Sequence, residues 1–416
     1  MLDSAQLLSS LAEAANAFII NGTVIMGVNR SVAGEIVIPD GITEIAKGAF
    51  RKQPITHIVF PSSLRIIGEE AFDSCVELLS FTFAGKSQLT TIMDRAFYSC
   101  IELSEFVIPG TAQFIGRQAF AFCAQSDPAA GIKRSIHDLV IPEGAYVYEK
   151  CFDHTNIDLL HIKADIIIPY SFSNANVFRV SWESGSRIIP EHAFAYCMSL
   201  CEFIFSDTTN IEVIAAGAFE CCTDLFSMQV PDGVRAIHQR AFADSGLQYF
   251  KAPKSLKVIG DFALAHTPCL SIDLGNSDLE VIGDCAFADT QITSLVVRGT
   301  IKVLDYGIVA GCKQLVSLRI GPSVEYFMDR QRQSLKSVQK GYVKFDMAII
   351  LEGVDTKCEN SVVAPIIFLP YGACMPDCNP KLEDYLQDIS KGLHRTDGLA
   401  DAYGRYAKSA RSFIYY

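Results

Sequence analysis

Apolar and polar residues alternate along short segments that return through most of the chain. Examples are "ITHIVFP" (55–61), "LSEFVIP" (103–109) and "LFSMQVP" (225–231). Alternation with a period of two is typical of a strand with one buried face. Proline closes several of these segments, where a missing N–H costs little because the strand ends there. We therefore expect a half-buried strand in each segment.

A second, shorter apolar stretch follows each strand and leads into an Ala-Phe pair, as in "LRIIGEEAF" (64–72) and "LKVIGDFAL" (256–264). The Phe or its equivalent recurs at Phe50, Phe72, Phe97, Phe120, Phe152, Phe172, Phe194, Phe219, Phe242, Leu264, Phe287 and Val309. Successive spacings are 22, 25, 23, 32, 20, 22, 25, 23, 22, 23 and 22 residues. A sustained period near 23 residues predicts a solenoid.

Each repeat is expected to form one coil: a strand, a turn, a short second extended segment, and an arc that carries the Phe inward. One coil cannot bury its own Phe and Ile side chains, but a dozen stacked coils share a continuous core. The spacing of 32 contains the insertion "AQSDPAAGIKRS" (124–135), whose composition predicts an exposed loop. Trp182 falls on an inward strand position and is expected to fill the core.

Two repeats carry a fuller pattern: "CIELSEFVIPGTAQFIGRQAF" (100–120) and "CCTDLFSMQVPDGVRAIHQRAF" (221–242). Both run from Cys through an alternating segment that ends in Pro to Ala-Phe, and the first also has the Ile-Gly step. This pattern resembles the BspA-like, or Treponema-type, leucine-rich repeats, and the resemblance covers residues 25–325. It implies a β-rich, right-handed, curved solenoid of about 12–13 repeats. For function it implies only a binding surface, because such repeats serve many different targets.

The two ends of the chain lack the repeat. Residues 1–24 are expected to form a helix/strand cap, in which Leu8, Leu11, Ala12 and Ala15 share one helix face. An atypical export signal is the alternative, although this segment has no basic start and is interrupted by acidic residues. Residues 326–416 are expected to form a small α+β segment. Its predicted strands lie in 340–353 and 361–372, and its predicted helices in 381–393 and 398–416. It is either a cap or a separate domain.

Six of the fourteen cysteines occupy one position of the repeat, three residues after the Phe. They are Cys75, Cys100, Cys123, Cys197, Cys222 and Cys312, and Thr155, Ala175, Ser245, Thr267 and Thr290 fill the same position elsewhere. Cys, Ser and Thr can each hydrogen-bond to the turn backbone, and a metal or disulfide would not tolerate Ala. We therefore expect a structural row of reduced thiols.

A zinc site is the alternative for the C-terminal cysteines. Cys374 and Cys378 stand close together in "CMPDC", with Cys358 before them and His394 after them. Structural zinc sites usually show two such pairs, and only one is present here. We expect no metal and no cofactor.

Catalytic motifs are absent: the sequence has no nucleophile elbow, no His-Glu-x-x-His, no phosphate-binding Gly loop and no dinucleotide fingerprint. We expect no enzyme. The net charge of -12 argues against nucleic acid and against binding to anionic membranes by charge. No apolar run reaches the ~18–20 residues of a membrane span. Thiols without a clear export signal favour the cytoplasm. The resemblance implies a cell-surface or secreted location as the alternative.

The outward side chains of the predicted strands should form columns along the solenoid. They include His57, Glu105, Asp138, His161, Arg179, Glu202, Tyr249, Lys251, Asp273 and Arg319. We expect a mixed-charge, hydroxyl-rich face with few large apolar groups, which favours a protein partner over a glycan. A solvated face without a ligand is the competing interpretation.

The sequence thus predicts a non-enzymatic leucine-rich-repeat scaffold that binds a protein, such as a host or matrix protein, through its strand face. In the alternative, the repeats are a targeting module for an activity or second binding site in 326–416. That segment is locally basic, with Lys391, Arg395, Arg405, Lys408 and Arg411.

Overall fold

The computed structural model describes residues 17–29, 31–275, 277–298, 300–301, 303–320, 326–328, 348–351, 366–369 and 412–415. These described residues form a β-solenoid of about 12 turns and contain almost no helix. It divides into two units. Unit 1 comprises Met1–Ile211 and Ala218–Leu225, and unit 2 comprises Glu212–Gly217 and Phe226–Tyr416.

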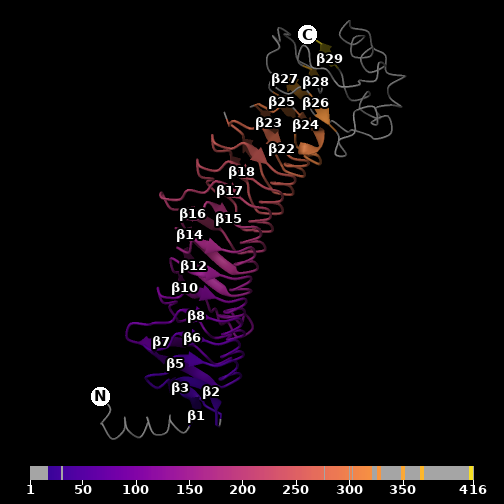
Figure 1. Ribbon diagram of the computed structural model, residues 1–416. Helices are drawn as coiled ribbons and strands as arrows, with labels where there is room; N and C mark the ends of the chain where they lie inside the picture. The colour runs from indigo at the N-terminus through magenta and orange to yellow at the C-terminus, as the bar shows by residue number, and fades with distance from the viewer. Residues whose placement is uncertain are drawn as a thin grey trace. The chain divides into compact units, whose positions relative to one another are not determined.

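Unit 1 contains one long strand in most of its coils, and these strands form two parallel sheets. The first sheet contains β3 (Gly34–Val37), β5 (Ile55–Pro61) and β7 (Ser80–Ala84). The second contains β10 (Ile136–Ile141), β12 (Asn156–Ile162), β14 (Asn176–Trp182) and β16 (Glu202–Phe205). Figure 1 shows the coils following one another from β1 to β16.

Short strands form a second face of unit 1. They are β4 (Glu44–Ile45), β6 (Ile66–Ile67), β8 (Thr91–Ile92), β9 (Phe114–Ile115), β11 (Tyr146–Val147), β13 (Ile166–Ile167) and β15 (Ile188–Ile189). At the N-terminal side, β1 (Phe18–Asn21) pairs antiparallel with β2 (Val24–Val28), and β2 pairs in parallel with β4. The predicted order of strand, short extended segment and arc is confirmed.

Unit 2 repeats this arrangement. Its short strands are β17 (Val213–Ile214), β18 (Ala236–Ile237), β20 (Val258–Ile259), β22 (Val281–Ile282) and β24 (Val303–Asp305). Its longer strands are β19 (Tyr249–Lys251), β21 (Ser271–Asp273), β23 (Ser294–Val297) and β25 (Ser317–Ile320). The 3-10 helix η1 (Tyr306–Val309) follows β24, and β26 (Tyr326–Met328) pairs with β24.

The strand predictions at 103–109 and 225–231 are only partly right. Glu105 and Ser227 form isolated bridges to Ser80 and Tyr249, and neither segment forms a strand. The alternation of burial survives, because Phe106 is buried and its neighbours are not. The coil after 103–109 carries the insertion, so no regular neighbouring strand follows it.

The C-terminal strands partly match the sequence predictions. β27 (Ala348–Leu351) and β28 (Ile366–Leu369) confirm the strands expected in 340–353 and 361–372. β29 (Ser412–Tyr415) pairs in parallel with β28, so the helix predicted over 398–416 is wrong at its end. Phe, Ile and Tyr favour a strand where they have a partner strand. The helices predicted in 1–24 and 381–393 and the pair Cys374 and Cys378 lie outside the described residues.

A column of stacked phenylalanines forms the core of unit 1. Adjacent rings from Phe50 to Phe219 are nearly parallel, at 4–9°. Their centroids lie 5.1–6.0 Å apart. Trp182 is buried and packs edge-on against Phe194, as its inward position predicts. The insertion after Phe120 is mostly exposed, as its composition predicts.

The arcs have an unusual backbone that links neighbouring coils. Around Phe72, residues Glu70 and Ser74 have positive φ values of 53° and 61°. Each such non-glycine residue costs about 1–2 kcal/mol. The N–H groups of Glu70, Phe72 and Ser74 donate to the next coil at 3.0, 2.8 and 2.7 Å, and these bonds offset the cost. The arcs therefore align the coils as well as carry the Phe.

Candidate functional site

The long strands of unit 1 present two columns of outward side chains. The first, called the acidic column, contains Glu35, His57, Ser80, Glu105, Asp138, Leu159, Arg179 and Glu202. The second, called the apolar column, lies two residues further along each strand. It contains Val37, Val59, Thr82, Val107, Val140, His161, Ser181 and Ile204. We call the two columns together the strand face of unit 1.

The apolar column corrects one expectation from the sequence. Val37, Val107 and Ile204 are 54%, 72% and 49% exposed, so this face does carry large apolar groups. Beside it, Phe178 on β14 is 51% exposed. The alternating pattern already marks these residues as outward, although their apolar side chains do not distinguish them from ordinary strand residues in the sequence. Val59 and Val140 in the same column are half-buried. Thr82, His161 and Ser181 interrupt the column, so its apolar side chains are spaced along the coils and do not form one continuous patch.

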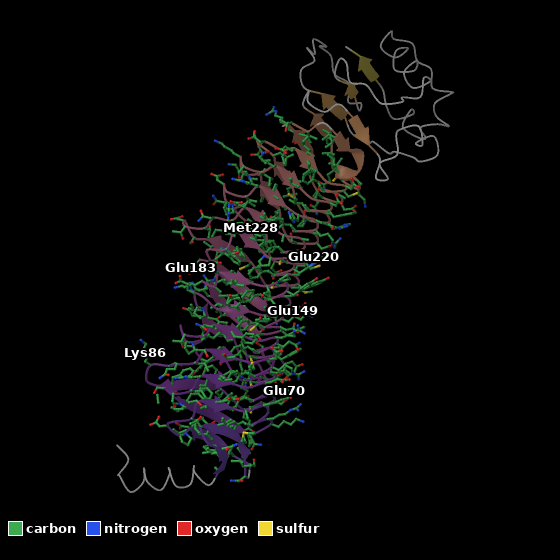
Figure 2. All side chains as sticks on the ribbon, in the orientation of Figure 1. Glu70, Lys86, Glu149, Glu183, Glu220 and Met228 are labelled. Carbon is green, nitrogen blue, oxygen red and sulfur yellow. The ribbon has the colours of Figure 1, made fainter. Side chains whose placement is uncertain are left out.

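Several carboxylates of the acidic column have no ion-pair partner within the described part of the chain. Glu35, Glu105 and Glu202 are exposed and form no salt bridge there. On the arcs, by contrast, charges pair with each other: Arg95 lies 3.4 Å from the buried Asp73, and Lys47 lies 2.8 Å from Glu69. Figure 2 shows Glu70 and Glu149 on the arc side of unit 1 and Glu183 on the opposite side. The strand face therefore carries exposed carboxylates that form no ion pair among the described residues.

Histidines and carboxylates pair in the middle of this face. His161 Nδ1 lies 2.7 Å from Glu183 Oε1, and His161 Nε2 lies 3.6 Å from Asp138 Oδ1. The hydrogen bond from His161 lowers the pKa of Glu183 below its ordinary value.

A second pair lies on the preceding coils. His137 Nδ1 lies 2.7 Å from Asp158 Oδ2, and the Ser135 hydroxyl donates to Asp158 Oδ1 at 2.6 Å. Burial raises the pKa of Asp158, but these hydrogen bonds outweigh burial and the pKa lies below its ordinary value. Both carboxylates therefore stay ionised, and the Lys163 ammonium, 3.6 Å from Glu183 Oε2, offsets the charge of Glu183.

The strand face of unit 2 has a different chemistry. Tyr249 is 56% exposed and stands in register with Ser227 and Ser271. Lys251 and Asp273 stand in register with each other, two residues further along β19 and β21. Hydroxyl groups dominate this face, as the sequence predicts for the whole array.

Most of the predicted site residues lie on strands, and Glu105 forms an isolated bridge to Ser80. His57, Glu105, Asp138, Arg179, Glu202, Tyr249, Lys251 and Asp273 are exposed, and His161 is half-buried. Arg319 stands in register with Val296. They divide into the faces of the two units, and the structure brings Asp138 into contact with His161.

The repeat cysteines are structural donors, as predicted. The Sγ atoms of Cys75, Cys100 and Cys123 donate to the Phe carbonyl of the preceding coil at 3.0, 3.2 and 3.3 Å. Thr155 makes the equivalent bond to Phe120 O with its hydroxyl. All eleven described cysteines are free thiols. Burial raises the pKa of Cys75 to about 12, so its thiol stays protonated and unreactive.

The stacked parallel coils with an inward Phe column define a leucine-rich-repeat β-solenoid. A family model described as the BspA type leucine rich repeat region, in six copies, matches residues 29–127, 133–247 and 212–331. The chain belongs to the BspA-type leucine-rich-repeat family. No helix in the described residues is long and apolar enough to cross a membrane.

One solved structure has a similar fold, and others match the chain with lower TM-scores. A leucine-rich repeat protein from Bacteroides ovatus is 18% identical with a TM-score of 0.52, and the match covers 96% of this chain and 97% of that one. A leucine rich cell surface protein from Faecalibacterium prausnitzii is 20% identical with a TM-score of 0.45, covering 81% and 93%. The T. pallidum leucine rich repeat protein is 24% identical with a TM-score of 0.35, covering 49% and 82%. No curated protein matches the chain in sequence.

Proposed function

We propose that this chain is a non-enzymatic scaffold that binds a protein partner through its strand face. One observation carries the proposal. Along the long strands of unit 1, carboxylates without an ion-pair partner lie beside exposed valine and isoleucine side chains. Protein interfaces combine an apolar centre with a polar rim, and this face offers both side by side. Membership of a repeat family supports binding over catalysis, because stacked repeats build extended surfaces.

The proposal is tested by capture with matched variants of the full chain. Ile204→Asp places a charge in the apolar column, while Ile166→Asp makes the same change on short strand β13, where Ile166 is similarly exposed at 42%. We expect a protein captured by the wild type to be lost with Ile204→Asp and kept with Ile166→Asp. Equal capture by both variants would contradict the proposal that the partner binds the strand face. Loss of capture after glycan removal would indicate a glycan ligand.

The thiols do not restrict the location of this protein. The expectation of a cytoplasmic protein relied on the cysteines needing a reducing compartment, and the structure does not support it. Cys100 and Cys123 are fully buried and burial raises their thiol pKa, so oxidants have little access to a thiolate. Such thiols are equally compatible with a cell-surface or secreted location.

The alternative function, a separate activity in 326–416, makes a distinct prediction. A chain truncated after residue 325 that stays folded and captures the same partner would assign a separate role to that segment. Precipitation of the truncated chain would identify the segment as a cap over the apolar core.

A further inference from the structure

We infer that the partner segment bound by unit 1 is a cationic amphipathic helix, with lysine or arginine over the acidic column and apolar side chains over the apolar column. This inference rests on the proposed function and specifies its partner. It concerns unit 1 alone, because the strand face of unit 2 is dominated by hydroxyl groups.

The charge of the two columns selects a cationic partner. The acidic column carries four carboxylates, from Glu35, Glu105, Asp138 and Glu202, against the single guanidinium of Arg179. Glu183 beside the columns is ionised, because its pKa is lowered, but Lys163 Nζ lies 3.6 Å from it and offsets its charge, so the excess of negative charge comes from the acidic column itself. Complementary charge steers a partner and fixes its register. Ammonium and guanidinium groups would form charge-assisted hydrogen bonds with these carboxylates.

The spacing of the columns fits a helix. The two columns are two residues apart along each strand, or about 7 Å, and successive coils are about 5 Å apart. A helix with its side chains is about 10–12 Å wide, so one helix lying along the columns contacts both of them. An extended segment that runs along the columns points only every second side chain at the surface, so its cationic and apolar residues would face the same column.

The same charges disfavour a second copy of this chain as the occupant. Two strand faces packed together would bring Glu105 or Glu202 of one copy near the carboxylates of the other. The net charge of -12 adds a repulsion between copies. A partner segment with positive charge avoids both costs.

Fluorescence anisotropy with the full chain and defined peptides tests the inference. The probe is a labelled amphipathic helical peptide of leucine and lysine, about 18 residues long, which spans about five coils. One comparator replaces every lysine by glutamate, and a second keeps the leucine–lysine composition but scrambles the order. We expect binding of the amphipathic leucine–lysine peptide, weaker binding of its scrambled form, and none of the glutamate form.

Two pairs of protein variants locate the contact. Glu105→Gln with Glu202→Gln should weaken binding about fivefold to tenfold, since each exposed ion pair contributes modestly. Glu77→Gln with Glu143→Gln changes the net charge equally at exposed glutamates outside the two columns, and should leave binding unchanged. Val107→Ser with Ile204→Ser removes the apolar contact and should weaken binding at least tenfold, whereas Ile166→Ser should not.

The inference is overturned by absent binding of the leucine–lysine peptide, by equal binding of the scrambled or glutamate peptides, or by equal losses in test and control variants. These outcomes are separate from failure of the proposed function. If Ile204→Asp abolishes capture of a protein partner while the peptides show no charge preference, the strand face binds a partner of another chemistry. Thermal unfolding of each variant verifies that it remains folded.

Discussion

At the scale of single residues, the position three residues after the Phe of each repeat favours a small side chain that can donate a hydrogen bond. Sulfur itself is not needed there. Cys100 Sγ donates to Phe72 O at 3.2 Å, and the Cys75 N–H donates to the same carbonyl. The Thr155 hydroxyl performs this role in another coil. The sequence shows this interchange directly, because Cys, Thr, Ser and Ala fill one register. It cannot show that the acceptor belongs to the preceding coil.

We therefore expect Cys100→Thr to keep the stability of the wild type and Cys100→Val to lose about 0.5–1.5 kcal/mol. Threonine and valine have nearly the same shape, so the pair isolates the hydrogen bond. Urea unfolding measures both. Equal stability of the two variants would show that the bond contributes nothing.

A glycine in the Ile-Gly step is required by close backbone approach. A Cβ on Gly68 would lie 2.5 Å from Ile45 O, whereas a Cβ on Gly110 would meet nothing within 4 Å. Gly68→Ala should destabilise the protein by about 1–3 kcal/mol because the backbone must shift. Gly110→Ala should change stability by less than about 0.5 kcal/mol. Thermal or urea unfolding distinguishes the two, and a neutral Gly68→Ala would contradict the account.

The pairing of Glu183 with His161 makes stability depend on pH. A carboxylate whose pKa is lowered by folding contributes stability above its unfolded pKa, ordinarily 4.5, and this stability is lost as pH falls through the lower folded pKa. Glu183→Gln should therefore be less stable than the wild type above pH 4.5, and the difference should shrink in more acidic solution. Urea unfolding across this range is the measurement, with exposed Glu143→Gln as the control. A difference independent of pH would assign it to packing instead.

At the scale of elements, the phenylalanine column joins the coils. Phe97 lies between Phe72 and Phe120, at 5.2 Å from each ring centroid. Phe97→Ala should cost about 3–5 kcal/mol through lost burial and a cavity. Phe97→Leu should cost less, because Leu264 fills the same position in unit 2. Calorimetry compares them, and equal losses would mean that ring stacking, and not volume, stabilises the column.

The elements also show what a sequence can and cannot predict. Period and alternation identify the inward Phe column, the buried Trp182 and the exposed insertion, because burial follows directly from those patterns. They overestimate the strand at 103–109, because a ladder depends on the neighbouring coil as well as on alternation. They miss β29, because Phe413 fits both a helical spacing and a strand, and pairing with β28 decides between them.

At the scale of the whole molecule, the column in which an outward residue stands indicates its part in a binding surface better than its residue type does. Polar residues such as Glu105 and Glu202 stand out in the sequence as candidates, while Val107 and Ile204 read as ordinary strand residues. Register alone reveals that an acidic column and an apolar column run side by side in unit 1. The two units consequently present different surfaces, although their repeats follow one pattern.

The central claim is that a protein partner contacts the strand face, and carboxylate footprinting of the complex tests it most directly. Glu35, Glu105 and Glu202 should be protected from carbodiimide labelling when the partner is bound, while Glu69 and Glu77, which lie outside the columns, should label as in the free chain. Protection of Glu69 and Glu77 with continued labelling of the strand-face glutamates would contradict the claim.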